Sequence, residues 1–183
     1  MDKNTYMKLL KEHRDRVYSY TLYCLRHQDD AEDVTQEVFL RLWKNGQELD
    51  LEKAEAWLIR VAHNLVVDHS RRRKTQRNHL GQVDTRALET IAEPEDSWSN
   101  PEQGLQLAGQ RQEIMDALAT LQPETRSVMV MHYFQGARLQ DIAATLGKKT
   151  STVKVQLHRA RKALRLVLDP GTEYPLASKR ETG

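Results

Sequence analysis

The sequence predicts an all-α protein, and three observations support this fold class. Apolar residues recur every three or four positions along most of the chain, which is the period of a helix with one buried face. Strand-like alternation of apolar and polar residues is nearly absent. An acidic stretch with Pro and Gly interrupts the helical pattern, which predicts two small helical domains joined by a flexible acidic linker. The expected segments are a first domain at 1–77, a linker at 78–110, a second domain at 111–169 and a mobile tail at 170–183.

The first domain contains three apolar stripes at helical spacing. They consist of Leu10, Val17 and Tyr20, then Val34, Val38 and Leu42, then Trp57, Val61 and Leu65. Asp30 and Asp33 predict the start of the second helix, with Asp30 as N-cap and Asp33 as an acid in the first turn. Trp57 is expected in the core rather than on a stacking surface, because it shares a stripe with Val61 and Leu65.

The second domain shows two further stripes, followed by a two-helix pattern. The stripes consist of Ile114, Leu118 and Leu121, then Val128, Met131 and Phe134. Pro123 and Glu124 suit the first turn of a helix. Gly147 suits a left-handed turn, and the small Ala143 before it lets a following helix cross closely. The spacing therefore predicts a helix-turn-helix.

The last helix of this motif has two different faces. Its apolar face consists of Val153, Leu157, Ala160, Leu164 and Leu168, and its outward face of Lys154, Val155, His158, Arg159 and Lys162. Thr150, Ser151 and Thr152 offer an N-cap at its start. Residues 146–168 carry seven Lys or Arg and no Asp or Glu. A solvated basic face is the simplest interpretation, but phosphates would relieve the charge repulsion, so DNA is the expected partner.

The second helix of the first domain also has an outward polar face. It begins acidic, with Asp33, Gln36 and Glu37, and ends basic, with Arg41. A solvated helix that complements its own dipole has this charge order, and a protein partner rich in arginine would also fit.

Several classes of protein are not supported by the sequence. The single cysteine, Cys24, excludes an internal disulfide, and Cys24 with His27 would leave a tetrahedral metal site half empty. No catalytic set is recognisable, so neither an enzyme nor a metal or other cofactor is expected. No apolar run reaches the length of a membrane helix, and the first residues lack the apolar core of a secretion signal, so a cytoplasmic protein is expected.

Three segments in order resemble the extracytoplasmic-function (ECF) sigma factors of bacterial RNA polymerase. DDAEDVTQEVFLRLW is similar to the family's polymerase-binding helix and AEAWLIRVAHNLVVDHSRRR to its promoter-melting helix. The stretch TLQPETRSVMVMHYFQGARLQDIAATLGKKTSTVKVQLHRARKAL is similar to its C-terminal DNA-binding domain. Together these segments span most of residues 5–168.

This resemblance implies roles for individual residues. Contacts to the polymerase core are implied for Asp33, Gln36, Glu37 and Arg41. Contacts near the minus-10 element are implied for Arg60, Asn64, Arg71 and Arg72, with the loop KNGQELDLEK holding an unstacked base. Contacts at the minus-35 element are implied for Ser151, Thr152, Lys154, His158 and Arg159.

The resemblance also implies partners, which are core RNA polymerase, promoter DNA and an anti-sigma factor. The acidic linker would then either occupy the RNA path of the polymerase or act only as a tether. A helix-turn-helix regulator that does not join the polymerase is the alternative function. An RNA-binding protein or ribonuclease is less well supported, because few exposed aromatic residues and no acid and base pair are expected.

Overall fold

The computed structural model describes residues 1–80 and 113–168, and these form helices joined by short turns, with no strand among them. The all-α prediction is therefore confirmed. The predicted mobile tail and nearly all of the predicted linker lie outside the described residues. None of the helices in the described part of the chain is both long and apolar enough to span a bilayer.

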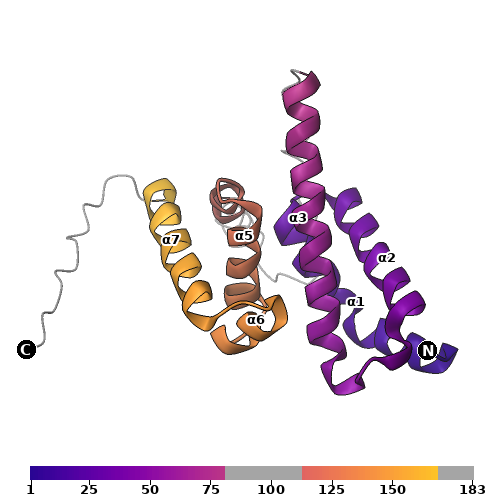
Figure 1. The fold of residues 1–183 in the computed structure, drawn as a ribbon. Helices are drawn as coiled ribbons and strands as arrows, with labels where there is room; N and C mark the ends of the chain where they lie inside the picture. The colour runs from indigo at the N-terminus through magenta and orange to yellow at the C-terminus, as the bar shows by residue number, and fades with distance from the viewer. Residues whose placement is uncertain (81–112, 169–183) are drawn as a thin grey trace, which may run out of the picture.

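The N-terminal part consists of three helices that pack against one another in pairs. They are α1 (Lys3–Leu25), α2 (Gln28–Asn45) and α3 (Ala54–Leu80), with two short 3-10 helices, η1 (Gly46–Glu48) and η2 (Leu51–Lys53), between α2 and α3. The C-terminal end of α3 projects beyond the neighbouring helices (Figure 1). Because α3 continues to Leu80, it runs three residues into the segment that was predicted as linker.

The C-terminal part, as far as the structure describes it, begins with a helix at residues 113–119 and continues with four further elements. These are α5 (Pro123–Met129), the π-helical turn η4 (Val130–Phe134), α6 (Leu139–Leu146) and α7 (Thr150–Leu168). Both α5 and α6 contact α7 on one side and α3 on the other. They therefore lie between α7 and the three N-terminal helices (Figure 1).

The turn between α1 and α2 is only two residues long, and it corrects the predicted N-cap. Arg26 adopts a left-handed conformation, with φ of 59°, and its N–H donates to the carbonyl of Leu22. His27 is the N-cap of α2, because its Nδ1 accepts a hydrogen bond from the N–H of Asp30 at 3.3 Å. Asp30 lies inside the first turn, where the helix dipole still favours a carboxylate.

Most of the first two predicted stripes face the core. Val17, Tyr20 and the whole stripe of α2 are buried, whereas Leu10 is only partly buried. Tyr20 and Leu42 are completely inaccessible to solvent. Each fully buried side chain of this size contributes roughly 1.5–3 kcal/mol to the free energy of unfolding.

The stripe predicted for α3 is wrong by one position. Leu58, Ala62 and Val66 are buried, whereas the predicted Trp57, Val61 and Leu65 are only partly buried. The reason is that α3 packs against α1 and α2 on one side and against α5 and α6 on the other. A helix that is covered on two sides has no single apolar stripe, and so its pattern does not identify the more deeply buried face.

The C-terminal stripes were predicted correctly in part. Leu118, Leu121, Val128 and Met131 are buried, but Ile114 and Phe134 are exposed, and Met115 occupies the core in place of Ile114. The π-helical turn explains Phe134: its extra residue per turn rotates the following side chains away from the stripe. Phe134 instead packs against Tyr23 of α1, with ring centroids 4.3 Å apart.

Candidate protein and nucleic-acid interfaces

A groove of about 660 Å³ lies between α1 and α2. Three of the predicted polymerase-binding residues, Asp33, Gln36 and Glu37, line it from α2, and Arg14 lines it from α1. Asp33 and Gln36 are exposed because α2 buries the face that carries Val34 and Val38. The groove therefore presents carboxylates and an amide to a partner.

The fourth predicted residue on this helix, Arg41, has a partner one turn away. Its Nε donates to the carboxylate of Glu37 at 2.8 Å, and both side chains are partly exposed. An exposed pair at this spacing contributes only about 0.3–0.5 kcal/mol. Arg41 therefore orients the carboxylate of Glu37, and a partner could displace Arg41 from it at a small cost in free energy.

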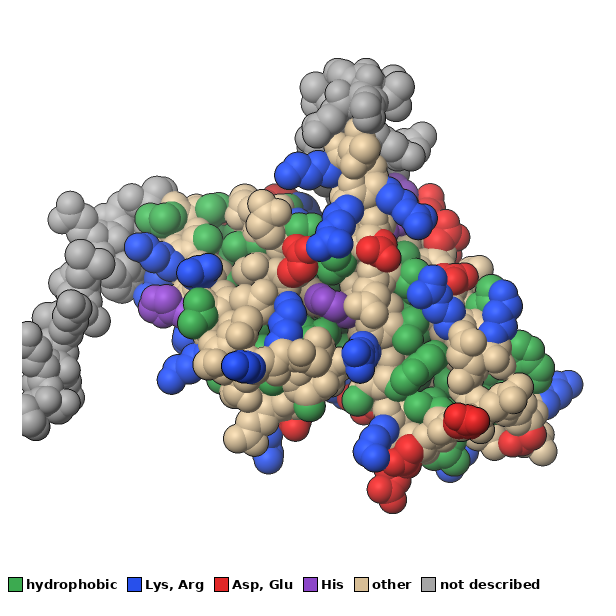
Figure 2. Space-filling model, viewed as in Figure 1, with side chains coloured by type: hydrophobic (Ala, Val, Ile, Leu, Met, Phe, Trp, Pro, Cys, Tyr) green, Lys and Arg blue, Asp and Glu red, His purple; other side chains and the backbone are tan. Residues whose placement is uncertain are grey.

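The predicted minus-10 residues lie along the solvent side of α3. Arg60, Asn64, Arg71 and Arg72 are all exposed. A second groove, of about 950 Å³, is lined on one side by Arg60, Trp57 and residues 48–50 and on the other by residues between 131 and 145 of the C-terminal part. Beside it, Asp50 caps η2. Figure 2 shows that Lys and Arg side chains gather along the upper part of α3.

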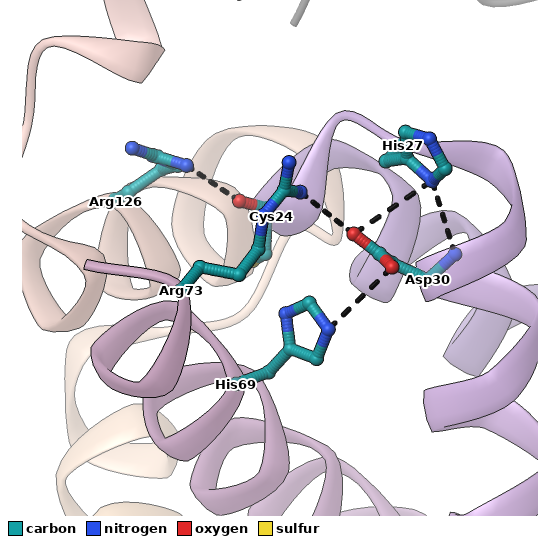
Figure 3. Close-up of polar contacts among 6 residues, drawn as sticks. All are labelled: Cys24, His27, Asp30, His69, Arg73 and Arg126. Atoms are coloured by element: carbon teal, nitrogen blue, oxygen red, sulfur yellow. Dashed lines mark hydrogen bonds and ion pairs between the residues drawn. The ribbon is translucent and has the colours of Figure 1, made fainter. Parts of the chain in front are cut away.

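A basic run follows on α3, consisting of Arg71, Arg72, Arg73, Lys74 and Arg77, and one of its members has a structural role. Arg73 donates to the carboxylate of Asp30 at 2.7 Å, and the same carboxylate faces His27 and His69 (Figure 3). Burial lowers the pKa of His69 more than the nearby Asp30 raises it. The contacts join the first turn of α2 to α3. Arg73 was not among the individual residues predicted to contact the minus-10 element.

The second domain contains the predicted helix-turn-helix. Gly147 ends α6 with φ of 63°, in the left-handed region, and its N–H points at the carbonyls of Ala143 and Ala144. The N–H of Lys148 then donates to the carbonyl of Ala143 at 2.9 Å, so the last turn of α6 is closed twice. Any side chain at position 147 would strain this turn.

The predicted minus-35 residues all lie on the exposed face of α7. Ser151, Thr152, Lys154, His158 and Arg159 are exposed, whereas Val153, Leu157 and Ala160 are buried. Because α7 begins at Thr150, Ser151 and Thr152 lie in its first turn rather than before it. The apolar face ends early, since Leu168 is 48% exposed. Lys and Arg side chains also gather over α7 in Figure 2.

Sequence reasoning missed a third set of residues, which joins the two domains. Ser127 Oγ of α5 lies 2.6 Å from Tyr20 Oη and 2.6 Å from His63 Nδ1, and all three side chains are buried. Arg126 donates to the carbonyl of Cys24 at 2.6 Å (Figure 3). It also donates to the carbonyls of Leu118, Ala119 and Leu121. Buried polar residues inside helical patterns were the available signal, but their partners lie far away in the sequence.

The described residues contain no group of three or more His, Cys, Asp or Glu side chains that could hold a metal ion. Cys24 is buried, and burial raises the pKa of its thiol to about 12. Such a thiol stays protonated, unlike the thiolate that metals bind.

Two family models match the chain in the order of these surfaces. Sigma-70 region 2 matches residues 9–76, and Sigma-70 region 4 matches residues 111–164. The ECF RNA polymerase sigma factor SigL of Mycobacterium tuberculosis is 35% identical over 162 residues, which cover 87% of this chain and 86% of SigL. The chain belongs to the ECF sigma factors. It therefore acts as a promoter-specific initiation factor of RNA polymerase.

Other relatives agree with this assignment. The ECF sigma factor SigE of Mycolicibacterium smegmatis is 35% identical over 164 residues, which cover 86% of this chain and 59% of SigE. SigW of Bacillus subtilis is 28% identical over 166 residues, which cover 90% of this chain and 89% of SigW. The solved sigma factor RpoE from Bartonella quintana, in complex with the anti-sigma factor NepR, has the same fold. It has a TM-score of 0.70 at 20% identity, over 91% of this chain and 98% of RpoE. Sigma factors as a family are not enzymes.

Proposed function

We propose that this ECF sigma factor divides promoter recognition among three of its surfaces. The α1/α2 groove binds core RNA polymerase, the exposed side of α3 and the loop of residues 44–53 meet the minus-10 element, and α7 reads the minus-35 element. The observation that carries this proposal is α7 itself, whose buried apolar side fixes a basic side toward solvent. The function places the protein in the cytoplasm, where polymerase and chromosome are found.

The polymerase contact is proposed for the acidic beginning of α2. Asp33, Gln36 and Glu37 share one groove and lie on a helix that is anchored by Val34, Val38 and Leu42. A partner surface that carries arginines would pair with these carboxylates through charge-assisted hydrogen bonds, which are stronger than neutral ones. Arg41 would then compete with the partner for Glu37 at a cost of only a few tenths of a kcal/mol.

The minus-10 contact is proposed for Arg60 and Asn64, with Arg71 and Arg72 bound to the DNA backbone. Guanidinium groups suit phosphates, and an exposed amide suits a base edge. Residues 48–50 beside Trp57, which form the N-terminal wall of this groove, would hold an unstacked base. Extrusion of a base costs a few kcal/mol, so contacts within this groove must offset that cost.

The minus-35 contact is proposed for the N-terminal half of α7. Lys154, His158 and Arg159 would reach base edges in the major groove, while Ser151 and Thr152 would bind phosphate at the start of the helix. Because each domain alone would bind weakly, the effective concentration created by joining them would raise the affinity for a promoter that carries both elements.

An anti-sigma factor is the proposed regulatory partner. The RpoE structure that shares this fold was solved in complex with one. In this chain, the grooves beside α2 and α3 are the surfaces that such a protein would cover, and its binding would compete with polymerase or DNA.

Run-off transcription tests the proposal. Purified core RNA polymerase is combined with a pool of genomic promoter fragments, with and without this protein. We expect discrete transcription start sites that depend on the protein, together with its binding to core. No such start sites and no binding to core would leave a helix-turn-helix regulator as the better account.

A further inference from the structure

The two domains meet at a buried set of hydrogen bonds. Tyr20 of α1 and His63 of α3 belong to the N-terminal part, and Ser127 of α5 belongs to the C-terminal part. Both contacts of Ser127 Oγ are 2.6 Å long, and the exposed fraction of Tyr20 and Ser127 is zero. We call these three residues the interdomain latch. One arrangement satisfies all three: Tyr20 donates to Ser127, which donates to a neutral His63.

The latch is satisfied only while the domains are in contact, because its donors and acceptors come from both. A buried polar group that loses its partner destabilises the structure by roughly 1–3 kcal/mol, whereas the same group in water loses little. The surrounding contacts act in the same direction. Arg126 donates to the carbonyl of Cys24, and Arg71 pairs with Glu124 at 2.7 Å. The side chains of Arg16 and Gln135 each donate to the main-chain carbonyl of the other residue, both at 3.1 Å.

The closed arrangement covers part of the proposed promoter surface. The turn of the helix-turn-helix lies against α3, because a Cβ added to Gly147 would be 3.8 Å from Nη2 of Arg60. Arg71, which is proposed to bind the DNA backbone, pairs instead with Glu124 of the C-terminal domain. DNA at the minus-10 site would therefore compete with contacts between the domains.

Promoter geometry makes the competition unavoidable. The two elements are named for positions about 25 base pairs apart, which is roughly 80 Å along straight duplex DNA. In the structure α5 and α6 contact both α3 and α7, so a single layer of helices separates the two reading surfaces, far less than that distance. Residues 81–112 connect the two described parts of the chain, and fully extended they would reach at most roughly 110 Å, enough to allow separation.

We propose that the Tyr20–Ser127–His63 latch holds this sigma factor in a closed state that cannot engage both promoter elements, and that initiation requires the latch to open. This inference rests on the proposed function of α3 and α7. Charged groups that face His63 come from three places: Lys148 of the turn, Glu124 of α5 and Arg71 of α3 itself. With two cations against one carboxylate, the latch accommodates a neutral imidazole better than an imidazolium.

The latch is tested by a distance measurement on the free full-length chain. Spin labels are attached at Glu12→Cys on α1 and Arg161→Cys on α7, which are both exposed. Cys24 is not labelled because it is buried and its pKa is raised to about 12. The labelled protein should give one short, narrow distance distribution by double electron–electron resonance.

Substitutions of Ser127 should open the domains. Ser127→Ala removes the hydroxyl that joins Tyr20 to His63 across the domains, so the ratio of open to closed molecules should rise about tenfold or more. Ser127→Leu adds bulk as well, and long distances should then dominate. The matched control is Thr21→Ala, which removes a buried hydroxyl bonded only within the N-terminal domain, to Tyr18, Ala31 and Thr35. The control should keep the short distance, and circular dichroism checks that each variant is folded.

Two outcomes would overturn the latch. One is a broad distribution in the chain with native Ser127, and the other is a short distance that persists in both Ser127 variants. Neither outcome depends on transcription, so a failed latch and a failed sigma-factor assignment are distinguishable. Affinity for DNA adds a second readout. Ser127→Ala should tighten binding to a duplex with both elements by the same factor as the opening ratio, and leave binding to the minus-35 element alone unchanged.

Discussion

Arg73 of α3 and Asp30 of α2 form an ion pair with 2.7 Å between guanidinium nitrogen and carboxylate oxygen (Figure 3). This pair joins the end of the proposed minus-10 surface to the beginning of the proposed polymerase-binding helix. Of the three consecutive arginines in the basic run, Arg73 is therefore structural, whereas Arg71 and Arg72 are exposed.

We expect Arg73→Ala to lower the free energy of unfolding by about 1–2 kcal/mol, since it leaves the half-buried Asp30 with weaker partners. Affinity for DNA at the minus-10 element should change little. Urea unfolding and DNA binding measure the two quantities. Arg72→Ala is the control, and it should show the opposite pattern. Equal losses of DNA affinity in both variants would contradict the structural role of Arg73.

Stability should fall in mild acid because of His63. Burial, with Lys148 adding to it, lowers the pKa of His63 to about 4 from an ordinary value of 6.5. Neutral His63 is therefore favoured by the folded, closed state. Its contribution to the free energy of unfolding is complete above about pH 6.5 and is lost as the pH falls toward 4. The loss at pH 5.5 is about 1 kcal/mol.

Melting temperatures between pH 7.5 and 5 measure this effect. His63→Gln should flatten the dependence on pH, although the lowered pKa of His69 leaves part of the slope in the same direction. A slope that is identical with and without His63 would show that the imidazole does not titrate with folding.

Asp33→Ala combined with Glu37→Ala should weaken binding to core RNA polymerase by about tenfold or more, as expected for the loss of two charge-assisted contacts. Helicity should not change, because both side chains face outward from α2. Affinity can be measured by fluorescence anisotropy with labelled protein. Glu32→Ala is a matched control, since Glu32 is exposed on the same helix but does not line the groove. If Glu32→Ala weakened binding as much as the double variant, the effect would come from the loss of negative charge on α2 and not from the groove.

Lys154→Ala and Arg159→Ala should each reduce affinity for the cognate minus-35 element by about 1–3 kcal/mol if they contact bases. The loss should be smaller on a scrambled element, because specific contacts are absent there. Electrophoretic mobility shifts with both sequences measure the difference. Lys8→Ala on α1 removes the same charge at an exposed site elsewhere. Losses of equal size on every sequence would assign the two residues to phosphate.

The sequence was sufficient to predict features that depend on local patterns. The all-α class, the left-handed Gly147 and the exposure of Lys154 and Arg159 follow from helical period and from the conformational freedom of glycine. The motifs around α2, α3 and α7 were also sufficient to identify the family, which the comparisons confirmed. Roles of individual site residues remain predictions.

Features that depend on contacts between domains were not predictable. Leu58 rather than Trp57 is buried because α3 is covered on two sides. The contact between His63 and Ser127 joins positions 64 residues apart. Nothing in the local pattern of either helix pairs these two polar residues, and the same holds for Arg126 and the carbonyl of Cys24.

The π-helical turn at Val130–Phe134 has a consequence for the length of the chain. Its carbonyl at Val130 accepts from the N–H of Gln135, five residues later rather than four. The turn therefore contains one amino acid more than a regular α-helix needs to cover the same rise. A deletion of one residue within it would allow regular helix to form, and would turn the Phe134 position by about 100° about the axis. The packing of the Phe134 ring on Tyr23 thus depends on the number of residues in this turn as much as on the presence of an aromatic side chain.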